Sequence, residues 1–268
     1  MQQPGYFILE KNAGIAWLTL NRPAKHNAMD DEFFTGLSQH FQQLGDDDDV
    51  RVVVLKGAGK SFSAGTDLAC AAKLAGGGGA DDRSRLHRRI LALQEAVRAV
   101  EACCKPVIAA IHGYCIGGAV DLICACDIRM AESATLFSIR ESRMGIIADL
   151  GTLQRLPRII GEGRARELAF SGRDFSAADA YEMGLVTRVC EGRQNLYDTA
   201  ESLARQIADN PPLTVMGVKD VFNYSRDHGV DAGLRYVAQK NAAMLLSEDL
   251  REAFAAFKEK RKPQFKGR

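Results

Sequence analysis

The chain has 268 residues, 46% of them hydrophobic, which is enough for one large domain or for a core with an appendage. Its 35 lysines and arginines nearly balance 34 aspartates and glutamates. The resulting net charge of +1 argues against nucleic acid or a charged membrane surface as a partner.

The N-terminal part of the chain alternates predicted strands and helices. Short apolar runs predict strands over residues 7–10 and 15–20, with a turn at Asn12-Ala13-Gly14 between them. Apolar residues at helical spacing predict a helix over residues 31–44. The β-branched run over residues 50–55 is typical of a buried parallel strand.

The same alternation continues through the middle of the chain. We expect a flexible glycine stretch at 76–79, a helix over 83–104, a strand over 106–111, a glycine turn over 113–118 leading into a helix that ends near 126, and short strands at 129–130 and 136–139. This order of elements predicts an α/β core.

The pattern changes to helices alone after about residue 195. We expect helices over residues 196–207, 213–224, 230–246 and 248–260. The predicted organisation is therefore a core over residues 1–195 and a helical region over residues 196–268. The basic tail after Lys258 is either a solvated end or part of a site for an anionic ligand.

The cysteines predict neither a disulfide framework nor a metal site. There are seven, an odd number, and no pair has the spacing of a zinc site. We expect reduced thiols in the core of a cytoplasmic protein, since the start of the chain also lacks a signal peptide's pattern. No apolar run is long enough to span a bilayer, and the last three residues are not a peroxisomal signal.

Two glycine-containing loops suggest backbone donors for a substrate oxygen. Residues 62–68 offer small side chains, although a plain tight loop is the simpler interpretation of this segment alone. In residues 112–118 two adjacent glycines precede a helix, as expected for one half of an oxyanion hole. The nearby run 57–61 lacks the first glycine of a phosphate loop, so we interpret it as a strand-exit turn.

Three acidic residues lie in segments that are otherwise apolar or small: Asp121, Glu141 and Asp149. Asp149 has apolar neighbours in sequence and no adjacent cation, which predicts a raised pKa suited to a general base. Structural roles are also plausible: an arginine partner for Asp121, Arg140 or Arg143 for Glu141, and the N-cap of a following helix for Asp149. A serine or cysteine hydrolase is disfavoured, and His112 is expected to be a packed histidine.

These residues resemble the crotonase, or enoyl-CoA hydratase/isomerase, superfamily along essentially the whole chain. The similar segments are Asn21-Arg22-Pro23 with Asn27-Ala28, and residues 62–68, 112–121, 125–129, 151–157 and 257–263. The resemblance implies a core of repeated ββα units that form two roughly perpendicular sheets, with C-terminal helices that build a homotrimer or a hexamer made of two trimers. It also implies an acyl-CoA thioester as substrate, with coenzyme A as part of the substrate and no separate cofactor or metal.

The resemblance also implies which residues form the site. The thioester oxygen would lie between the N–H groups of Thr66 and Gly118. The segment that lines the CoA and thioester site would be Ala64, Gly65, Thr66, Asp67 and Leu68, and Lys25 with the basic tail would contact CoA phosphates.

The three acids distinguish branches of the superfamily. Typical hydratases carry glutamate at the positions of Asp121 and Glu141 and glycine at that of Asp149. The set found here is similar to delta-3,5-delta-2,4-dienoyl-CoA isomerases of fatty-acid beta-oxidation. It implies Asp149 as base, Glu141 as acid and Asp121 as the group that orients Glu141. Water addition by an enoyl-CoA hydratase is the alternative, and a non-catalytic acyl-CoA- or RNA-binding member is a third possibility.

Overall fold

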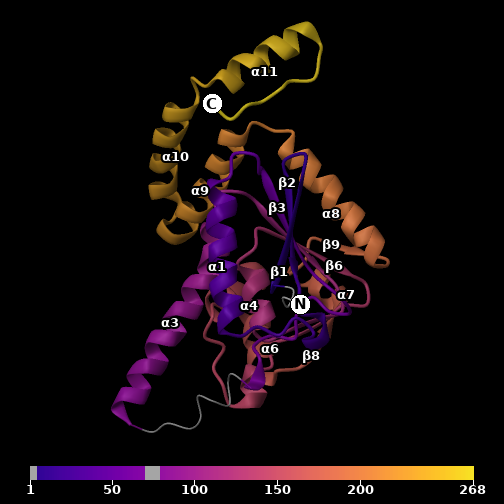
Figure 1. Cartoon of the computed structure of the whole chain (residues 1–268). Helices are drawn as coiled ribbons and strands as arrows, with labels where there is room; N and C mark the ends of the chain where they lie inside the picture. The colour runs from indigo at the N-terminus through magenta and orange to yellow at the C-terminus, as the bar shows by residue number, and fades with distance from the viewer. Residues whose placement is uncertain (1–4, 70–78) are drawn as a thin grey trace.

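A computed structural model describes residues 5–69 and 79–268 (Figure 1). Of the predicted glycine stretch 76–79, only Gly79 lies within the described residues, where it precedes the first turn of a helix. Among the described residues, no helix is both long and apolar enough to cross a membrane.

The core is a six-stranded sheet whose central strands are buried on both faces. Its order is β1-β2-β3-β4-β6-β9, with β1 antiparallel to β2 and every other neighbouring pair parallel. The strands are β1 (Phe7–Asn12), β2 (Ile15–Leu20), β3 (Val52–Gly57), β4 (Val107–Ile111), β6 (Ile128–Glu132) and β9 (Arg188–Cys190). The alternating α/β pattern is confirmed, although the first hairpin turn is tighter than predicted because Asn12 pairs with Ile15.

A second sheet has three short strands, β5 (Tyr114–Ile116), β7 (Leu136–Ser138) and β8 (Asp174–Ser176). Of these, only β7 was predicted as a strand from the sequence. The prediction of a plain glycine turn over 113–118 is wrong at its centre, because Cys115 pairs with Phe137 of β7. Three residues carry too little periodicity to indicate a strand between glycines.

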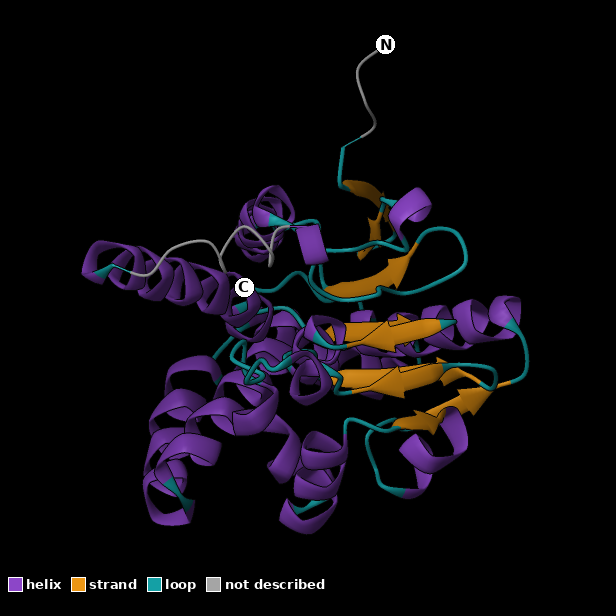
Figure 2. Ribbon diagram, turned by 90° about the horizontal axis from the view of Figure 1, so that it is seen from below, coloured by secondary structure: helices purple, strands orange, loops and turns teal. Residues whose placement is uncertain are grey.

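Helices cover both faces of the large sheet (Figures 1 and 2). On one face lie α1 (Asp31–Asp46), α3 (Ala80–Ala102) and α4 (Gly118–Cys124), whose apolar residues join the larger core cluster. On the other lies α8 (Arg193–Ala208), which packs on the second cluster with Val52, Val54 and Ile108. The predicted region boundary near residue 195 thus falls inside the helix that completes the core.

Three further helices lie between residue 144 and β9: α5 (Thr152–Ile160), α6 (Glu162–Ser171) and α7 (Ala177–Glu182). Of these, only the start of α5 was expected from the sequence. Two short 3-10 helices, η1 (Pro23–Lys25) and η2 (Glu141–Met144), lie in the loops that lead to the acid and glycine segments.

The last three helices extend away from the sheets (Figure 1). They are α9 (Pro212–His228), α10 (Val230–Met244) and α11 (Glu248–Glu259). They expose large apolar side chains, including Phe222, Leu234, Phe254 and Phe257. Exposed apolar groups at this density are typical of an interaction surface.

The basic C-terminal tail folds back onto the protein. Asp249 accepts hydrogen bonds from the N–H groups of Lys266 and Gly267, at 2.7 and 2.9 Å. Arg51 donates to the carbonyl of Phe265 at 2.6 Å, and Lys262 forms an ion pair with Asp209 at 2.7 Å. The tail is therefore anchored at several points along its length.

Candidate active site

The two glycine loops meet beside β5. Phe62 donates its N–H to the carbonyl of His112 at 2.7 Å, and Ser63 donates to that of Tyr114 at 3.0 Å. The N–H of Ile116 returns a bond to the carbonyl of Ser63 at 3.2 Å. These main-chain bonds bring Thr66 next to the start of α4.

Glycines at the two contact points allow these loops to approach closely. A Cβ on Gly65 would lie 2.4 Å from the carbonyl oxygen of Ile116, and the residue has φ +86°. A Cβ on Gly118 would lie 3.0 Å from Oγ1 of Thr66 and 2.9 Å from Cε of Met29. Within the described residues, neither the N–H of Thr66 nor that of Gly118 donates to a protein acceptor. Two neighbouring free donors are what an oxyanion hole requires.

Asp121 is the most buried of the three acids. It lies in α4 with 1% of its surface exposed, and its Oδ1 accepts the N–H of Thr152 at 2.6 Å. Burial, followed by the charge of Glu141, raises the pKa of Asp121 to about 7. The expected arginine partner is replaced by this main-chain bond.

Glu141 begins the short helix η2 and its carboxyl group lies against Gly117. A Cβ on Gly117, which has φ +55°, would lie 3.3 Å from Oε1 of Glu141. Burial and the charge of Asp149 raise the pKa of Glu141, and its Oε2 is buried with no hydrogen-bond partner among the described residues. Both neighbouring arginines have other partners: Arg140 forms an ion pair with Asp174, and Arg143 donates to the carbonyl of Ser171.

Asp149 lies in the loop between η2 and α5 and is half-buried. Burial raises its pKa, as the sequence predicted. Asp149 has fewer buried apolar neighbours than expected, because Ile147 is 76% exposed, while Ala148 and Leu150 are buried. The N-cap interpretation is wrong: Gly151 is the N-cap of α5, and Asp121 accepts the first helical N–H from across the site.

The charges of the three carboxyl groups act on one another. Those of Glu141 and Asp149 raise the pKa of Asp121, and that of Asp149 raises the pKa of Glu141. The structure therefore brings together three acids separated by 20 and 8 positions in the sequence. A cluster of this kind can hold one group protonated while another is ionised.

The expected CoA-binding segment is partly exposed and partly fixed in place. Ala64 and Leu68 are exposed, as is Lys25 in η1. Asp67 instead contacts protein: it forms an ion pair with Arg22 at 2.9 Å, while Lys25 is among the cations that lower its pKa. The backbone bond from Ala69 is the largest cause of that lowering. Asp67 thus anchors the loop that carries Thr66.

Sequence reasoning missed two residues that support loops of the site. The buried Asn27 donates to the carbonyls of Ala58, Ser61 and Phe62 at 2.8 to 3.0 Å, although the sequence showed it only as a family motif. Gln94 of α3 has no signal in the sequence, and it donates to the carbonyl of Asp149 at 2.6 Å.

The remaining polar candidates take structural positions. His112 is fully buried between Tyr197 and the carbonyl of Gly59, and burial with two nearby cations lowers its pKa to about 4. Across residues 5–69 and 79–268, no group of three His, Cys, Asp or Glu side chains is arranged to hold a metal. Six cysteines are free thiols, Cys104 is the exposed one of these, and Cys70 lies outside the described residues.

Comparison with known proteins shows the family of the chain. Residues 10–268 match the family described as "Enoyl-CoA hydratase/isomerase". The chain is 44% identical to "Delta(3,5)-Delta(2,4)-dienoyl-CoA isomerase, peroxisomal" of Arabidopsis thaliana, over 96% of this chain and 95% of that protein. It is 43% identical to the mitochondrial isomerase of the same name from Dictyostelium discoideum, over 97% and 91%. An enoyl-CoA hydratase structure from Bacillus anthracis superposes with a TM-score of 0.91 at 32% identity, covering 98% of this chain and all of that one.

Proposed function

The chain belongs to the enoyl-CoA hydratase/isomerase family, and from that premise we propose that it converts 3,5-dienoyl-CoA to 2,4-dienoyl-CoA. The observation that carries the proposal is Asp149, a third carboxyl group that interacts with Glu141 and Asp121. The isomerases of two organisms that are 43–44% identical over nearly the whole chain support the same substrate class.

The reaction moves two double bonds without net gain or loss of atoms. Asp149 takes a proton from C2, the carbon next to the thioester, and the C–H electron pair becomes the new C2–C3 double bond. The C3–C4 and C5–C6 double bonds give way to one at C4–C5, and Glu141 supplies a proton to C6. One proton must then pass from Asp149 back to Glu141 before the next turnover.

The glycine loops stabilise the intermediate. Negative charge shared with the thioester oxygen lies between the N–H groups of Thr66 and Gly118, and one such donor typically contributes about 3 kcal/mol. The two proton transfers require Asp149 ionised and Glu141 protonated at the start. Glu141 is the more buried of the two and has a buried oxygen without a partner, which favours its protonated form.

Asp121 supports this assignment of roles. The charge of Glu141 is one cause of the raised pKa of Asp121, so the two carboxyl groups are close enough to share a titration near neutral pH. Its bond to Thr152 also fixes the start of α5, directly after the Asp149 loop. No further cofactor is required by this scheme, since coenzyme A enters as part of the substrate.

The proposal extends to assembly and location. The exposed apolar side chains of α9, α10 and α11 support a homotrimer, or a hexamer made of two trimers. We also propose Lys25 and the basic tail as contacts for CoA phosphates. We keep the cytoplasm as the proposed location, with neither nucleic acid nor a membrane as partner.

Water addition to a 2-enoyl-CoA is the second candidate. It is favoured by the two acids at the hydratase positions and by the fold similarity to the Bacillus anthracis hydratase. The deciding experiment is an ultraviolet assay of conjugated product from 3,5-dienoyl-CoA, run beside hydration of crotonyl-CoA. We expect fast conjugation and slow hydration; the reverse result would assign a hydratase, and neither reaction with retained CoA binding would indicate a binding protein.

A further inference from the structure

The loop that carries Asp149 is held from behind by α3. Gln94 donates from Nε2 to the main-chain carbonyl of Asp149 itself, at 2.6 Å. Glu101 follows seven positions later on the same helix. Because seven residues make about two helical turns, the two side chains lie on one face of α3.

Arg155 links Glu101 to the same loop. Its Nη2 forms an ion pair with Oε2 of Glu101 at 2.9 Å, while Nη1 is 3.5 Å from the carbonyl oxygen of Leu150. Gly151, with φ +123°, leaves room for this guanidinium, because a Cβ there would lie 1.8 Å from Nη1. The loop conformation and the position of Arg155 therefore depend on each other.

Glu101 is itself fixed from a third direction. Arg226 of α9 forms an ion pair with its other oxygen, and Asn223 donates to its main-chain carbonyl at 3.3 Å. Burial alone would raise the pKa of Glu101, but Arg155 and Arg226 outweigh burial and hold the pKa below its ordinary value. The carboxylate therefore remains ionised through the neutral range and keeps both guanidinium groups in place.

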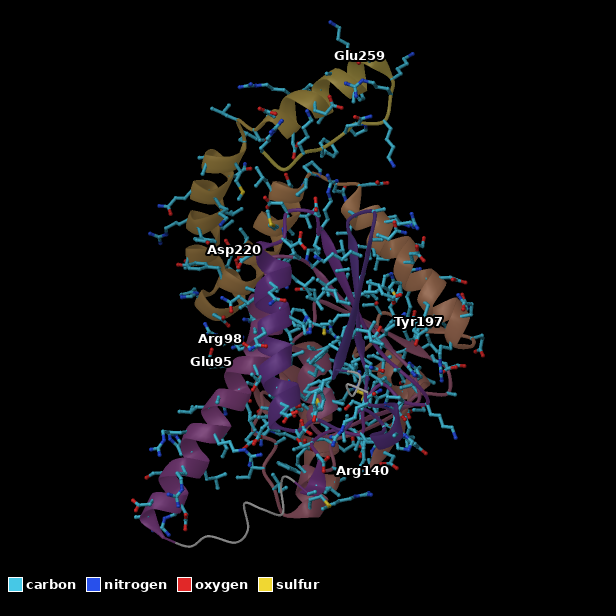
Figure 3. The ribbon with its side chains drawn as sticks, in the orientation of Figure 1. Glu95, Arg98, Arg140, Tyr197, Asp220 and Glu259 are labelled. Carbon is cyan, nitrogen blue, oxygen red and sulfur yellow. The ribbon has the colours of Figure 1, made fainter. Side chains whose placement is uncertain are left out.

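A cavity of about 670 Å³ borders these residues and reaches Asp149. The four guanidinium groups along its wall already have carboxylate partners: Arg98 with Glu95, Arg155 and Arg226 with Glu101, and Arg158 with Asp227. Glu95 and Arg98 lie next to each other on the outer side of α3 (Figure 3). A wall whose cations are all paired is poorly suited to an anionic ligand, and of these pairs the one between Arg155 and Glu101 reaches the Asp149 loop.

We propose that Gln94 and Arg155 are positioning residues for Asp149. Gln94 fixes the main-chain carbonyl of Asp149. Arg155, which is held by Glu101, fixes the next peptide and connects it to α9. The proposal rests on the proposed function, because it takes Asp149 to be the base that removes the C2 proton. Misplacing a reacting group by about 1 Å can cost about 100-fold in rate.

The first test compares Gln94→Met, which keeps the side-chain length but removes the donor, with wild-type protein. We expect kcat for 3,5-dienoyl-CoA to fall about 10- to 100-fold while KM stays within about twofold. Arg155→Gln should give the same split. Its matched control is Arg158→Gln, which lies one turn further along α5 and breaks only the exposed pair with Asp227, and should leave kcat unchanged.

Amide hydrogen exchange supplies a measurement that does not depend on activity. Exchange in residues 149–152 should accelerate in Gln94→Met and Arg155→Gln and stay unchanged in Arg158→Gln. Wild-type kcat in Gln94→Met, or a kcat loss with unaltered exchange in this segment, would overturn the positioning role. An inactive wild-type protein would overturn the proposed function instead, since the exchange comparison would still show whether the loop is held.

Discussion

The two sides of the candidate site are built by different means. On the donor side, Thr66 and Gly118 contribute main-chain N–H groups whose places are set by strand-like pairing between residues 62–66 and β5. On the acid side, Glu141 and Asp149 contribute side chains from a short 3-10 helix and a loop. The first arrangement depends on the absence of side chains, and the second depends on charge and on contacts from other elements.

Because of this difference, the two sides should respond to different kinds of substitution. The donor side has little room, so added atoms should damage it more than altered charge. The acid side has a half-buried base and acids whose charges raise one another's pKa, so isosteric changes of charge should damage it most. Changes on the two sides can therefore be compared directly through their kinetics.

The largest effect is expected from Asp149→Asn, which removes the base with almost no change of shape. We expect kcat to fall by about 10²- to 10⁴-fold, with CoA-ligand binding retained, measured in the ultraviolet assay and by calorimetry. Asp198→Asn on the exposed side of α8 is the control and should behave as wild type. Near-normal isomerisation by Asp149→Asn would show that Asp149 is not the base.

A somewhat smaller loss is expected from Gly118→Ala on the donor side. The added methyl group would contact Met29 and Thr66, displacing a donor from the thioester oxygen, so kcat should fall by about 10²- to 10³-fold. Gly163→Ala is the matched control, because a Cβ there meets nothing within 4 Å. An active Gly118→Ala with an inactive control would contradict the steric account.

A modest effect is expected from Asp67→Asn, which weakens the ion pair with Arg22 behind the donor loop. A partly exposed pair contributes up to about 1 kcal/mol, so KM for the acyl-CoA should rise by no more than about fivefold. Steady-state kinetics and thermal unfolding measure this change. A kcat loss as large as that of Gly118→Ala would mean that Asp67 does more than anchor the loop.

The smallest change in rate is expected from Asp121→Asn, whose effect should appear in the pH dependence. Because the charge of Glu141 is one cause of the raised pKa of Asp121, the two carboxyl groups titrate together near pH 7, and the kcat profile of Asp121→Asn should lose its inflection near that pH. The Asn oxygen can still accept the N–H of Thr152, which keeps the start of α5. Superimposable profiles for the two proteins would show that Asp121 does not act on Glu141.

The change in the free energy of unfolding with pH gives a second test of Asp121, and its direction follows from the raised pKa. Its native pKa of about 7 exceeds the unfolded value of 3.8, so the native state binds the proton more tightly. This contribution is fully present below pH 3.8 and is lost as the pH rises toward 7. Urea unfolding should show that decline in wild-type protein and a weaker one in Asp121→Asn.

Sequence reasoning found the parts of the site that have a local signature. Adjacent glycines before a helix and acids among apolar residues are visible within a few positions, which is why Gly118, Asp121 and Asp149 were identified. The family resemblance added the pairing of Thr66 with Gly118. The α/β alternation was likewise clear wherever apolar runs were long.

What failed in the sequence reasoning depends on contacts between distant segments. The cap role considered as an alternative for Asp149 belongs to Asp121, because a sequence shows which helix start needs an acceptor but not that another helix supplies it. Gln94 is 55 positions from the carbonyl that it contacts, and Glu101 is 54 from Arg155. The strand β5 is too short to have a period of its own.

The bond between Asp121 and Thr152 has a consequence for redesign. Turning this chain into a hydratase by lengthening Asp121 to Glu would add a methylene to a packed interior, which typically costs about 1–3 kcal/mol. It would also move the acceptor away from the first N–H of α5. One side chain, Asp121, thus contributes both to the specificity of the acid cluster and to the folding of α5. A change of chemistry at that position also requires a new acceptor for the first N–H of the helix.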